Sequence, residues 1–121
     1  MLCDFLVAGP NSDEELLANK GPTILNINER AEILKHCKFV NEVAIGTPYR
    51  PDKALLDSIN CSFYAHGDDP TFDHNGVDIT AELSELGMFK MFKRTEGVST
   101  TDITGKLLAL SEWKLQQEKL E

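Results

Sequence analysis

Long apolar runs are absent from this sequence. The longest, such as residues 5–8 and 107–110, fall far short of the ~20 residues that a helix needs to cross a bilayer, so no membrane-spanning segment is expected. The N-terminus also lacks a basic stretch before its short apolar run, which argues against a secretory signal. We therefore expect a cytoplasmic protein.

Cysteine is scarce, and the three that occur are not arranged as pairs. Cys3, Cys37 and Cys61 are an odd number without C-x-x-C spacing, so neither a disulfide framework nor a zinc knuckle is indicated. Each thiol is expected to be reduced and packed in the core.

Basic residues are too few to balance the acidic ones. The chain has 12 Lys and Arg against 20 Asp and Glu, a net charge of −8. This charge excludes a general attraction to nucleic acid or to anionic lipid, because most of the surface has the wrong sign. Any polyanion must therefore bind at a local patch.

Apolar residues are sufficient for one folded domain over residues 1–121, since they make up 41% of the chain. Short apolar runs alternate with helical spacing, and the run at 5–8 is typical of a strand buried on both faces. This alternation predicts an α/β domain of Rossmann-like type with a parallel sheet. The expected strands are 5–8, 40–45, 61–65 and 89–93, and the expected helices are 12–17, 26–38, 51–59, 78–86 and 99–120.

Ligands of such sheets bind outside the carboxyl ends of the strands, which points to the loops 9–21, 46–50, 66–70 and 94–102. Residues 88–106 carry four basic and two acidic side chains, or +2, within a chain of −8. They lead into Ser99–Asp102, a helix start whose N–H groups, hydroxyls and dipole favour an anion. The pattern predicts a phosphate site, or else an exposed basic strand end beside an ordinary helix cap.

His66–Asp69 follows the third expected strand. Its imidazole and carboxylates are candidates for holding polar ligand groups or a metal, although a lone histidine makes the metal less favoured, and an ordinary turn before Pro70 is the alternative. Tyr49 is a candidate to offer an aromatic face to a cation, or is simply packed. Lys20 is a candidate phosphate contact, or an ordinary solvent-facing lysine.

Residues 94–103 read Arg-Thr-Glu-Gly-Val-Ser-Thr-Thr-Asp-Ile. This run resembles the R-T-E-G-[IV]-S-T-[ST]-D-[IL] signature of the phosphocholine and phosphoethanolamine cytidylyltransferases. The similarity extends over about residues 5–110, and His66–Asp69 with Lys93 and Arg94 looks closer to the phosphoethanolamine enzymes. Further similar segments are Phe5–Gly9, Ser12–Glu14, Lys20-Gly21, Asn28–Arg30, His36–Val43 and Pro48-Tyr49.

The resemblance implies a Rossmann-like nucleotidyltransferase fold and the transfer of CMP from CTP to phosphoethanolamine. The products would be pyrophosphate and CDP-ethanolamine, an intermediate of phospholipid synthesis. Phosphocholine is the alternative substrate, and an inactive nucleotide-binding or regulatory fragment is the other alternative. Mg²⁺ would accompany the nucleotide, with no metal bound by the protein itself.

The resemblance also implies a role for each candidate residue. Lys20 and Arg94 would be catalytic, neutralising the CTP phosphates, and three hydroxyl residues would bind phosphate at the helix start. His66 would border the nucleotide, and the remaining candidates would bind the phosphoamine. The three hydroxyl residues are Ser99, Thr100 and Thr101, and the phosphoamine residues are Tyr49, Asp68 and Asp69.

The sequence departs from this family at one point. The family places a His-x-Gly-His motif after its first strand, whereas these 121 residues contain no such motif and open at what resembles the second strand. By resemblance, the first strand is central to the sheet. Its neighbours are then expected to lack hydrogen-bond partners, and a homodimer is expected to supply them.

Overall fold

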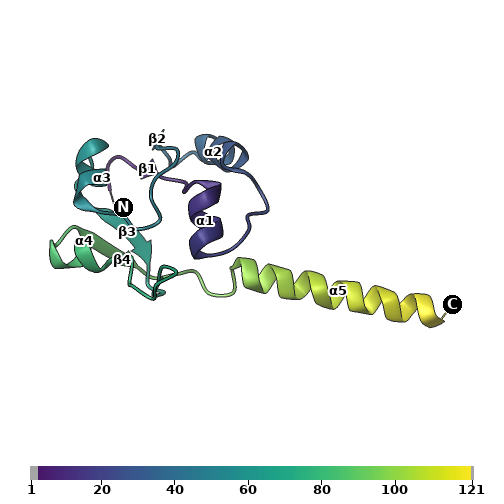
Figure 1. Cartoon of the computed structure of the whole chain (residues 1–121). Coiled ribbons are helices and arrows are strands. Elements are labelled where there is room, and N and C mark those ends of the chain that lie inside the picture. Colours follow the sequence, from purple (N-terminus) through teal and green to yellow (C-terminus); the bar gives the residue numbers. More distant parts are fainter. Residues whose placement is uncertain (1–2, 121) are drawn as a thin grey trace.

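The computed structural model describes residues 3–120, in which strands and helices alternate (Figure 1). The predicted α/β class is thus confirmed. The strands are β1 (Val7–Ala8), β2 (Glu42–Val43), β3 (Tyr64–Gly67) and β4 (Phe89–Phe92). The helices are α1 (Asp13–Asn19), α2 (Ile27–Lys35), α3 (Lys53–Ser58), α4 (Ala81–Glu85) and α5 (Thr100–Leu120).

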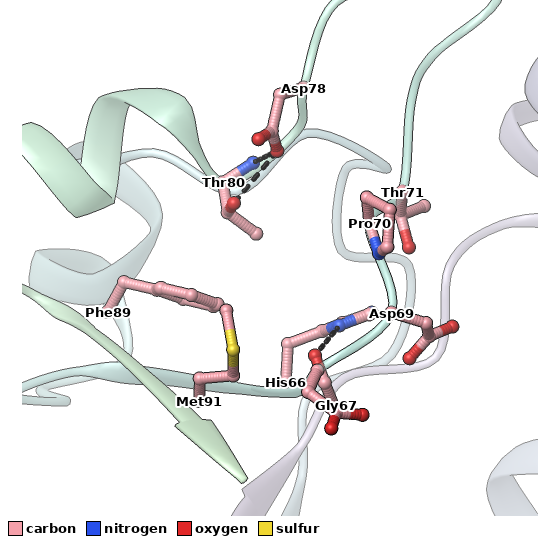
Figure 2. A pocket seen from close by; sticks show the side chains of 10 residues that line it. His66, Gly67, Asp69, Pro70, Thr71, Asp78, Thr80, Phe89 and Met91 are labelled. Atoms are coloured by element: carbon pink, nitrogen blue, oxygen red, sulfur yellow. Dashed lines mark hydrogen bonds between the residues drawn. The ribbon is translucent and has the colours of Figure 1, made fainter. Parts of the chain in front are cut away.

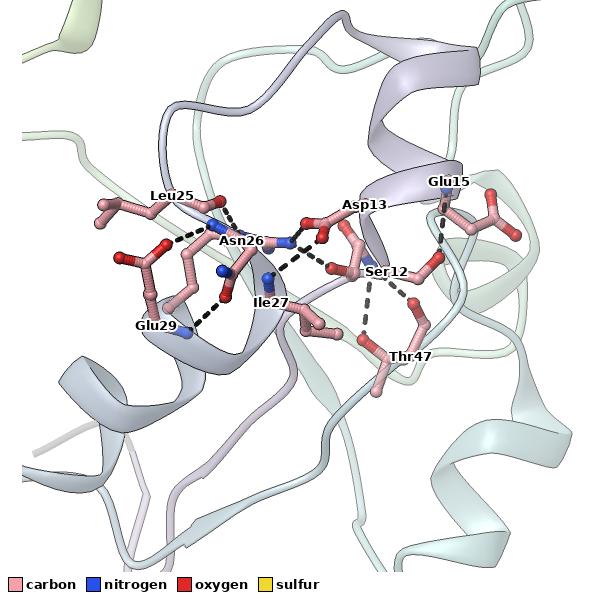
Figure 3. Close-up of polar contacts among 10 residues, drawn as sticks. Ser12, Asp13, Glu15, Leu25, Asn26, Ile27, Glu29 and Thr47 are labelled. Atoms are coloured by element: carbon pink, nitrogen blue, oxygen red, sulfur yellow. Dashed lines mark hydrogen bonds and ion pairs between the residues drawn. The ribbon is translucent and has the colours of Figure 1, made fainter.

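Side-chain caps fix where the first two helices begin (Figure 3). The Ser12 hydroxyl accepts the Glu15 N–H at 3.1 Å. Asn26 and Glu29 form a reciprocal capping box at the start of α2. The Arg30 guanidinium then joins the two helices, because it pairs with the Asp13 carboxylate at 2.6 Å. The loops around β1 are thereby held by polar contacts rather than by a large core.

Thr47 joins the end of β1 to the loop after β2. Its hydroxyl donates to the Gly9 carbonyl at 2.9 Å, and its own carbonyl accepts from the Asn11 amide at 2.9 Å. Thr47 is buried, and a Cβ on Gly9 would lie only 2.8 Å from its methyl group. Glycine is therefore needed where the chain leaves β1.

The strands form two separate parallel pairs, β1 with β2 and β3 with β4. The predicted parallel pairing is confirmed, and the two pairs agree with the expectation that strands beside the central position lack hydrogen-bond partners within residues 3–120. The carbonyls of Leu6 and Ala8 accept from Glu42 and Ala44 at 3.2 and 2.9 Å. Because successive residues of a strand alternate, Val7 turns its N–H and carbonyl to the opposite edge. Within residues 3–120, no strand pairs with that edge of β1 or with the free edge of β3.

The hydrophobic core is small and consists of Ala31, Leu56, Ile79 and Leu83 among the described residues. The prediction that residues 5–8 are buried on both faces is wrong, because Val7 and Ala8 are half-buried and Phe5 is 59% exposed. Burial on both faces requires other elements packed over each face of β1, and the small core does not provide them. The cysteines also differ from expectation: all three thiols are free, but Cys37 is exposed, and Cys3 and Cys61 are half-buried.

Helix α5 leads away from the rest of the chain (Figure 1). Every residue from Thr100 to Leu120 is exposed, including Ile103, Leu107 and Trp113. None of the helices in the described part of the chain is long and apolar enough to span a membrane.

Candidate functional site

Strand β3 carries the predicted His-Gly pair into the sheet. It runs to Gly67, two residues further than predicted, because its register with β4 sets Tyr64 opposite Phe89 and His66 opposite Met91. The Tyr64 ring stacks on the rings of His66 and Phe89, each at 6.2 Å between centroids. Burial raises the pKa of the Tyr64 hydroxyl. One face of β3 and β4 therefore carries a row of rings that holds the His66 imidazole in place.

His66 opens onto a small hollow beside this face, which we call the β3 pocket (Figure 2). The Nδ1 of His66 donates to the Gly67 carbonyl at 3.0 Å, which leaves Nε2 for a ligand. Across the pocket, Asp78 accepts from the Thr80 N–H and hydroxyl at 2.9 and 2.8 Å. These bonds lower the pKa of Asp78. The pocket is lined by His66, Gly67, Asp68, Asp69, Pro70, Thr71, Asp78, Thr80, Phe89 and Met91.

Arg94 follows β4 and lies against the end of β3. The Arg94 guanidinium pairs with the Asp69 carboxylate at 3.6 Å, and the Arg94 backbone N–H donates to the Asp68 carboxylate at 3.2 Å. A Cβ on Gly67 would lie 2.9 Å from both the Arg94 Cγ and the Asp69 Oδ1. The missing side chain of Gly67 therefore makes room for Arg94 and its partner.

A second, wider hollow, which we call the α5 hollow, lies at the start of α5. It is lined by Lys20, Asp69, Arg94 and residues 95–102, and its volume is about 910 Å³. That volume is within the range of ~300–1,000 Å³ typical of small-molecule sites. Lys20 reaches it from the end of α1, and Arg94 from the end of β4. Two cations far apart in the sequence thus face one space.

The start of α5 is arranged for an anion. The Ser99 hydroxyl accepts the Asp102 N–H at 3.0 Å, as the predicted cap requires, and its own hydrogen remains available as a donor. The N–H groups of Thr100 and Thr101 have no acceptor within residues 3–120. Free N–H groups at a helix start, the helix dipole and two nearby cations all favour a negatively charged ligand.

Most of the predicted site residues lie in these two hollows. The α5 hollow contains Lys20, Arg94, Ser99, Thr100 and Thr101, the β3 pocket contains His66 and Asp68, and Asp69 lines both. Tyr49 lines neither hollow but is near enough to Tyr64 to help raise its pKa. Its role beside an amine stays a prediction.

Sequence reasoning missed the far wall of the β3 pocket. Asp78, Thr80 and Met91 line this far wall, whereas the sequence predicted only the wall formed by His66–Asp69. The Asp78-x-Thr80 spacing is typical of a turn in which the carboxylate accepts from the second residue on, and it could have marked this wall. Met91 depends on the register of β4 against β3, which has no local signal.

Metal ligands do not cluster in the described part of the chain. No group of three His, Cys, Asp or Glu side chains is arranged there to hold an ion. Three carboxylates, Asp69, Glu96 and Asp102, line the α5 hollow beside the two cations. They are suited to meet a cation brought in by a ligand, since Mg²⁺ binds through one or two carboxylates plus phosphate oxygens.

Comparisons with known proteins place this arrangement in a family. The ethanolamine-phosphate cytidylyltransferase of Dictyostelium discoideum is 43% identical over 115 residues, which are 95% of this chain and 32% of that protein. The mouse protein of the same name is 38% identical over 108 residues, 89% of this chain and 27% of that protein. Human choline-phosphate cytidylyltransferase A is 36% identical over 104 residues, 86% of this chain and 28% of that protein.

The chain spans about a third or less of the length of these curated relatives. A sequence model described as cytidylyltransferase-like matches residues 2–106, which cover both hollows and all four strands. The parallel strands with their crossover helices agree with the Rossmann-like α/β fold expected of such a domain. On these grounds the chain belongs to the cytidylyltransferase-like family.

Proposed function

We propose that this domain transfers CMP from CTP to phosphoethanolamine, giving CDP-ethanolamine and pyrophosphate for phospholipid synthesis. The observation that carries the proposal is the convergence of Lys20, Arg94 and the start of α5 on one hollow. The relatives named ethanolamine-phosphate cytidylyltransferase support the choice of reaction, at 38–43% identity in slime mould, mouse, Arabidopsis and yeast.

The reaction forms a bond between a phosphate oxygen of phosphoethanolamine and the α-phosphorus of CTP. The bond from the α-phosphorus to the β-phosphate oxygen breaks, and pyrophosphate leaves with the electron pair. Catalysis of such a transfer depends on positioning and on neutralising the charge that develops on the leaving group. Lys20 and Arg94 supply positive charge, and the N–H groups of Thr100 and Thr101, with the Ser99 hydroxyl, supply hydrogen bonds. Mg²⁺ entering with the nucleotide would add to this neutralisation beside Asp69.

The β3 pocket, about 110 Å³ in volume, is too small for a whole nucleotide, so its residues are proposed to contact one end of the nucleotide and the phosphoamine. His66 Nε2 is available to a polar group of the nucleotide, since Nδ1 is already bonded. A primary ammonium can donate hydrogen bonds to Asp68 or Asp69, whereas a trimethylated one cannot. This chemistry favours phosphoethanolamine over phosphocholine, and Tyr49 would stand near the amine.

Phosphocholine is the second candidate substrate, because rat and human choline-phosphate cytidylyltransferase A are 36% identical to this chain. A nucleotide-binding or regulatory module without turnover is the other candidate. Equal or larger kcat/KM with phosphocholine would favour the choline reaction. CTP binding without turnover on either phosphoamine would favour the binding module.

Calorimetry with CTP tests the α5 hollow directly. Arg94→Ala should weaken CTP binding by ~1.5–3 kcal/mol, the usual loss when a charge-assisted hydrogen bond to phosphate is removed. Lys114→Ala is the matched control, because it removes one exposed positive charge further along α5. Equal CTP affinity for the two variants would contradict the assignment.

We also infer a homodimer in the cytoplasm. The free edges of β1 and β3 support self-association, since unpaired strand edges readily bind another chain. The free thiols of Cys3, Cys37 and Cys61 support a reducing compartment.

A further inference from the structure

Residues 71–79 form a closed hairpin whose two ends line the β3 pocket. Phe72 and Asp78 form an antiparallel bridge, and the Ile79 N–H donates to the Thr71 carbonyl at 3.1 Å. Inside the hairpin, the Asp73 carboxylate accepts from the N–H groups of Asn75 and Val77 at 2.9 and 3.0 Å. The hairpin is rooted in the core by Ile79, which is only 4% exposed. The hairpin is therefore held in one conformation by its own hydrogen bonds and is anchored in the core at one end.

His74, in the turn of this hairpin, contacts the last residue of α1. Its backbone N–H and its Nδ1 both donate to the Asn19 Oδ1, at 3.1 and 2.7 Å. Because an amide oxygen only accepts, Nδ1 carries a hydrogen here. The Asn19 Nδ2 is used as well, since it donates to the Glu15 carbonyl at 2.8 Å. Both ends of the Asn19 amide are thus bonded, one to the hairpin and one to α1.

Asn19 directly precedes Lys20, which is exposed and lines the α5 hollow. The Lys20 N–H closes the last turn of α1 on the Leu16 carbonyl at 2.7 Å, and Gly21 follows with φ +134°. Lys20 is thus held at its N–H by the last turn of α1, and the chain leaves the helix directly after it. The contact from His74 supplies a second anchor.

We propose that His74 and Asn19 form a clamp that positions Lys20 at the phosphate site and holds it at a fixed place relative to the β3 pocket. The clamp joins Asn19, next to Lys20, to His74, which is 55 residues further along the sequence in the hairpin beside the β3 pocket. His74 does not touch the ligand and acts through Lys20. The inference rests on the proposed function only in naming CTP phosphate as the ligand that Lys20 meets.

A double-mutant cycle with calorimetry separates positioning from simple stabilisation. His74→Ala should weaken the binding of CTP and of inorganic tripolyphosphate by about fivefold, the usual effect of one lost hydrogen bond. In a Lys20→Ala background the same change should have no further effect, because its only route to the ligand is gone. His74→Asn should restore affinity, since the asparagine Nδ2 can donate where Nδ1 did.

His36→Ala is the matched control, because His36 is an exposed histidine at the end of α2 whose Nδ1 contacts a backbone carbonyl at 2.8 Å. Hydrogen exchange gives a readout without ligand: the Lys20 and Gly21 amides should exchange faster in His74→Ala and normally in His74→Asn. An equal loss of affinity in the Lys20→Ala background would overturn the clamp, and so would unchanged exchange at Lys20. A protein that binds tripolyphosphate but not CTP would contradict the proposed function. The double-mutant cycle would then still test the clamp, with tripolyphosphate as the ligand.

Discussion

Gly67 and Arg94 make the site depend on one missing side chain. A methyl group on Gly67 would meet the Arg94 Cγ and the Asp69 Oδ1, each at 2.9 Å. Gly67→Ala should therefore displace both side chains and weaken CTP binding by about 1–2 kcal/mol, part of the ~1.5–3 kcal/mol of a charge-assisted phosphate contact. Calorimetry measures this loss, and Ser62→Ala, at an exposed position just before β3, is the control.

Gly67→Ala in an Arg94→Ala background tests whether Gly67 affects CTP binding through Arg94. In Arg94→Ala the Cγ that the new methyl group of Gly67→Ala would meet is absent. If Gly67 acts through Arg94, the losses of CTP affinity from the two substitutions are therefore less than additive. Fully additive losses would mean that Gly67 serves the ligand in another way.

The Asp73 carboxylate gives the hairpin a pH dependence. Its hydrogen bonds from Val77 and Asn75 lower its pKa below the ordinary value of 3.8. A lowered pKa in the folded state means that the carboxylate stabilises the fold above pH ~3.8 and that this contribution is lost as pH falls through the folded pKa. Asp73→Asn keeps the acceptor but removes the charge.

We expect Asp73→Asn to be less stable than the unchanged chain near neutral pH and equally stable once the pH is below the folded pKa. Denaturant unfolding across the acid range measures the difference. Asp57→Asn, at an exposed carboxylate on α3 that pairs with Lys53, is the control. A stability difference that grows as the pH falls would contradict the assigned direction.

Helix starts could be predicted from the sequence because their signals are local. Ser12, Asn26 and Ser99 each accept an N–H three residues on, which is the pattern that predicted the three helices. Strand limits could not, because they depend on partners distant in the sequence. β3 extends to Gly67 since Gly67 pairs with Phe92, and nothing within residues 61–67 encodes that register.

Helix α5 contains a glycine in a fully exposed interior position. Nothing lies within 4 Å of where a Cβ on Gly105 would be. Gly105→Ala should therefore stabilise the first turns of α5 by up to about 1 kcal/mol, because alanine loses less backbone entropy in a helix. Circular dichroism at rising temperature measures the gain in helix.

Gly97→Ala provides the comparison for α5, because Gly97 has φ +74° and alanine would be strained there. Gly105→Ala should therefore raise the thermal stability of the chain, and Gly97→Ala should lower it. An unchanged or lower helix content in Gly105→Ala would mean that α5 is held against another surface in solution, one that a methyl group disturbs.

In the molecule as a whole, the sequence predicted the parallel strands and the gap in their pairing, but not which strands pair with each other. Arg94 and Ser99 share one hollow because the carboxyl end of a strand and the start of the next helix meet at one edge of an α/β domain, a rule that needs no coordinates. Lys20 reaches the same hollow from the C-terminal end of α1, which that rule does not place there. The partners of β1 and β3 could not be predicted, because strand pairing cannot be deduced from either segment alone. The connection from β1 to β2 runs through α1 and α2, and that from β3 to β4 through α4. The other edges of β1 and β3 stay free in residues 3–120.

Those free edges lead to a prediction about assembly. Two-stranded sheets are marginal by themselves, and unpaired N–H and carbonyl groups bind further strands. Pairing between copies is opposed by the net charge of −8 on each. We therefore expect a dimer whose affinity rises with salt, because the Debye length falls from ~10 Å at 0.1 M to ~3 Å at 1 M. Sedimentation velocity over a salt series measures this.

A substitution at Val7 tests whether the free edge of β1 forms the dimer contact. The Val7 N–H faces away from β2, so Val7→Pro removes a donor from the free edge of β1 while leaving the bonds at Leu6 and Ala8 available to β2. Dimerisation should weaken in Val7→Pro, whereas Val7→Ala, which keeps the N–H, should dimerise as the unchanged chain does. A monomer at every salt concentration would contradict the dimer. A dimer indifferent to Val7→Pro would move the contact away from β1, to the free edge of β3 or to the apolar side chains that α5 exposes.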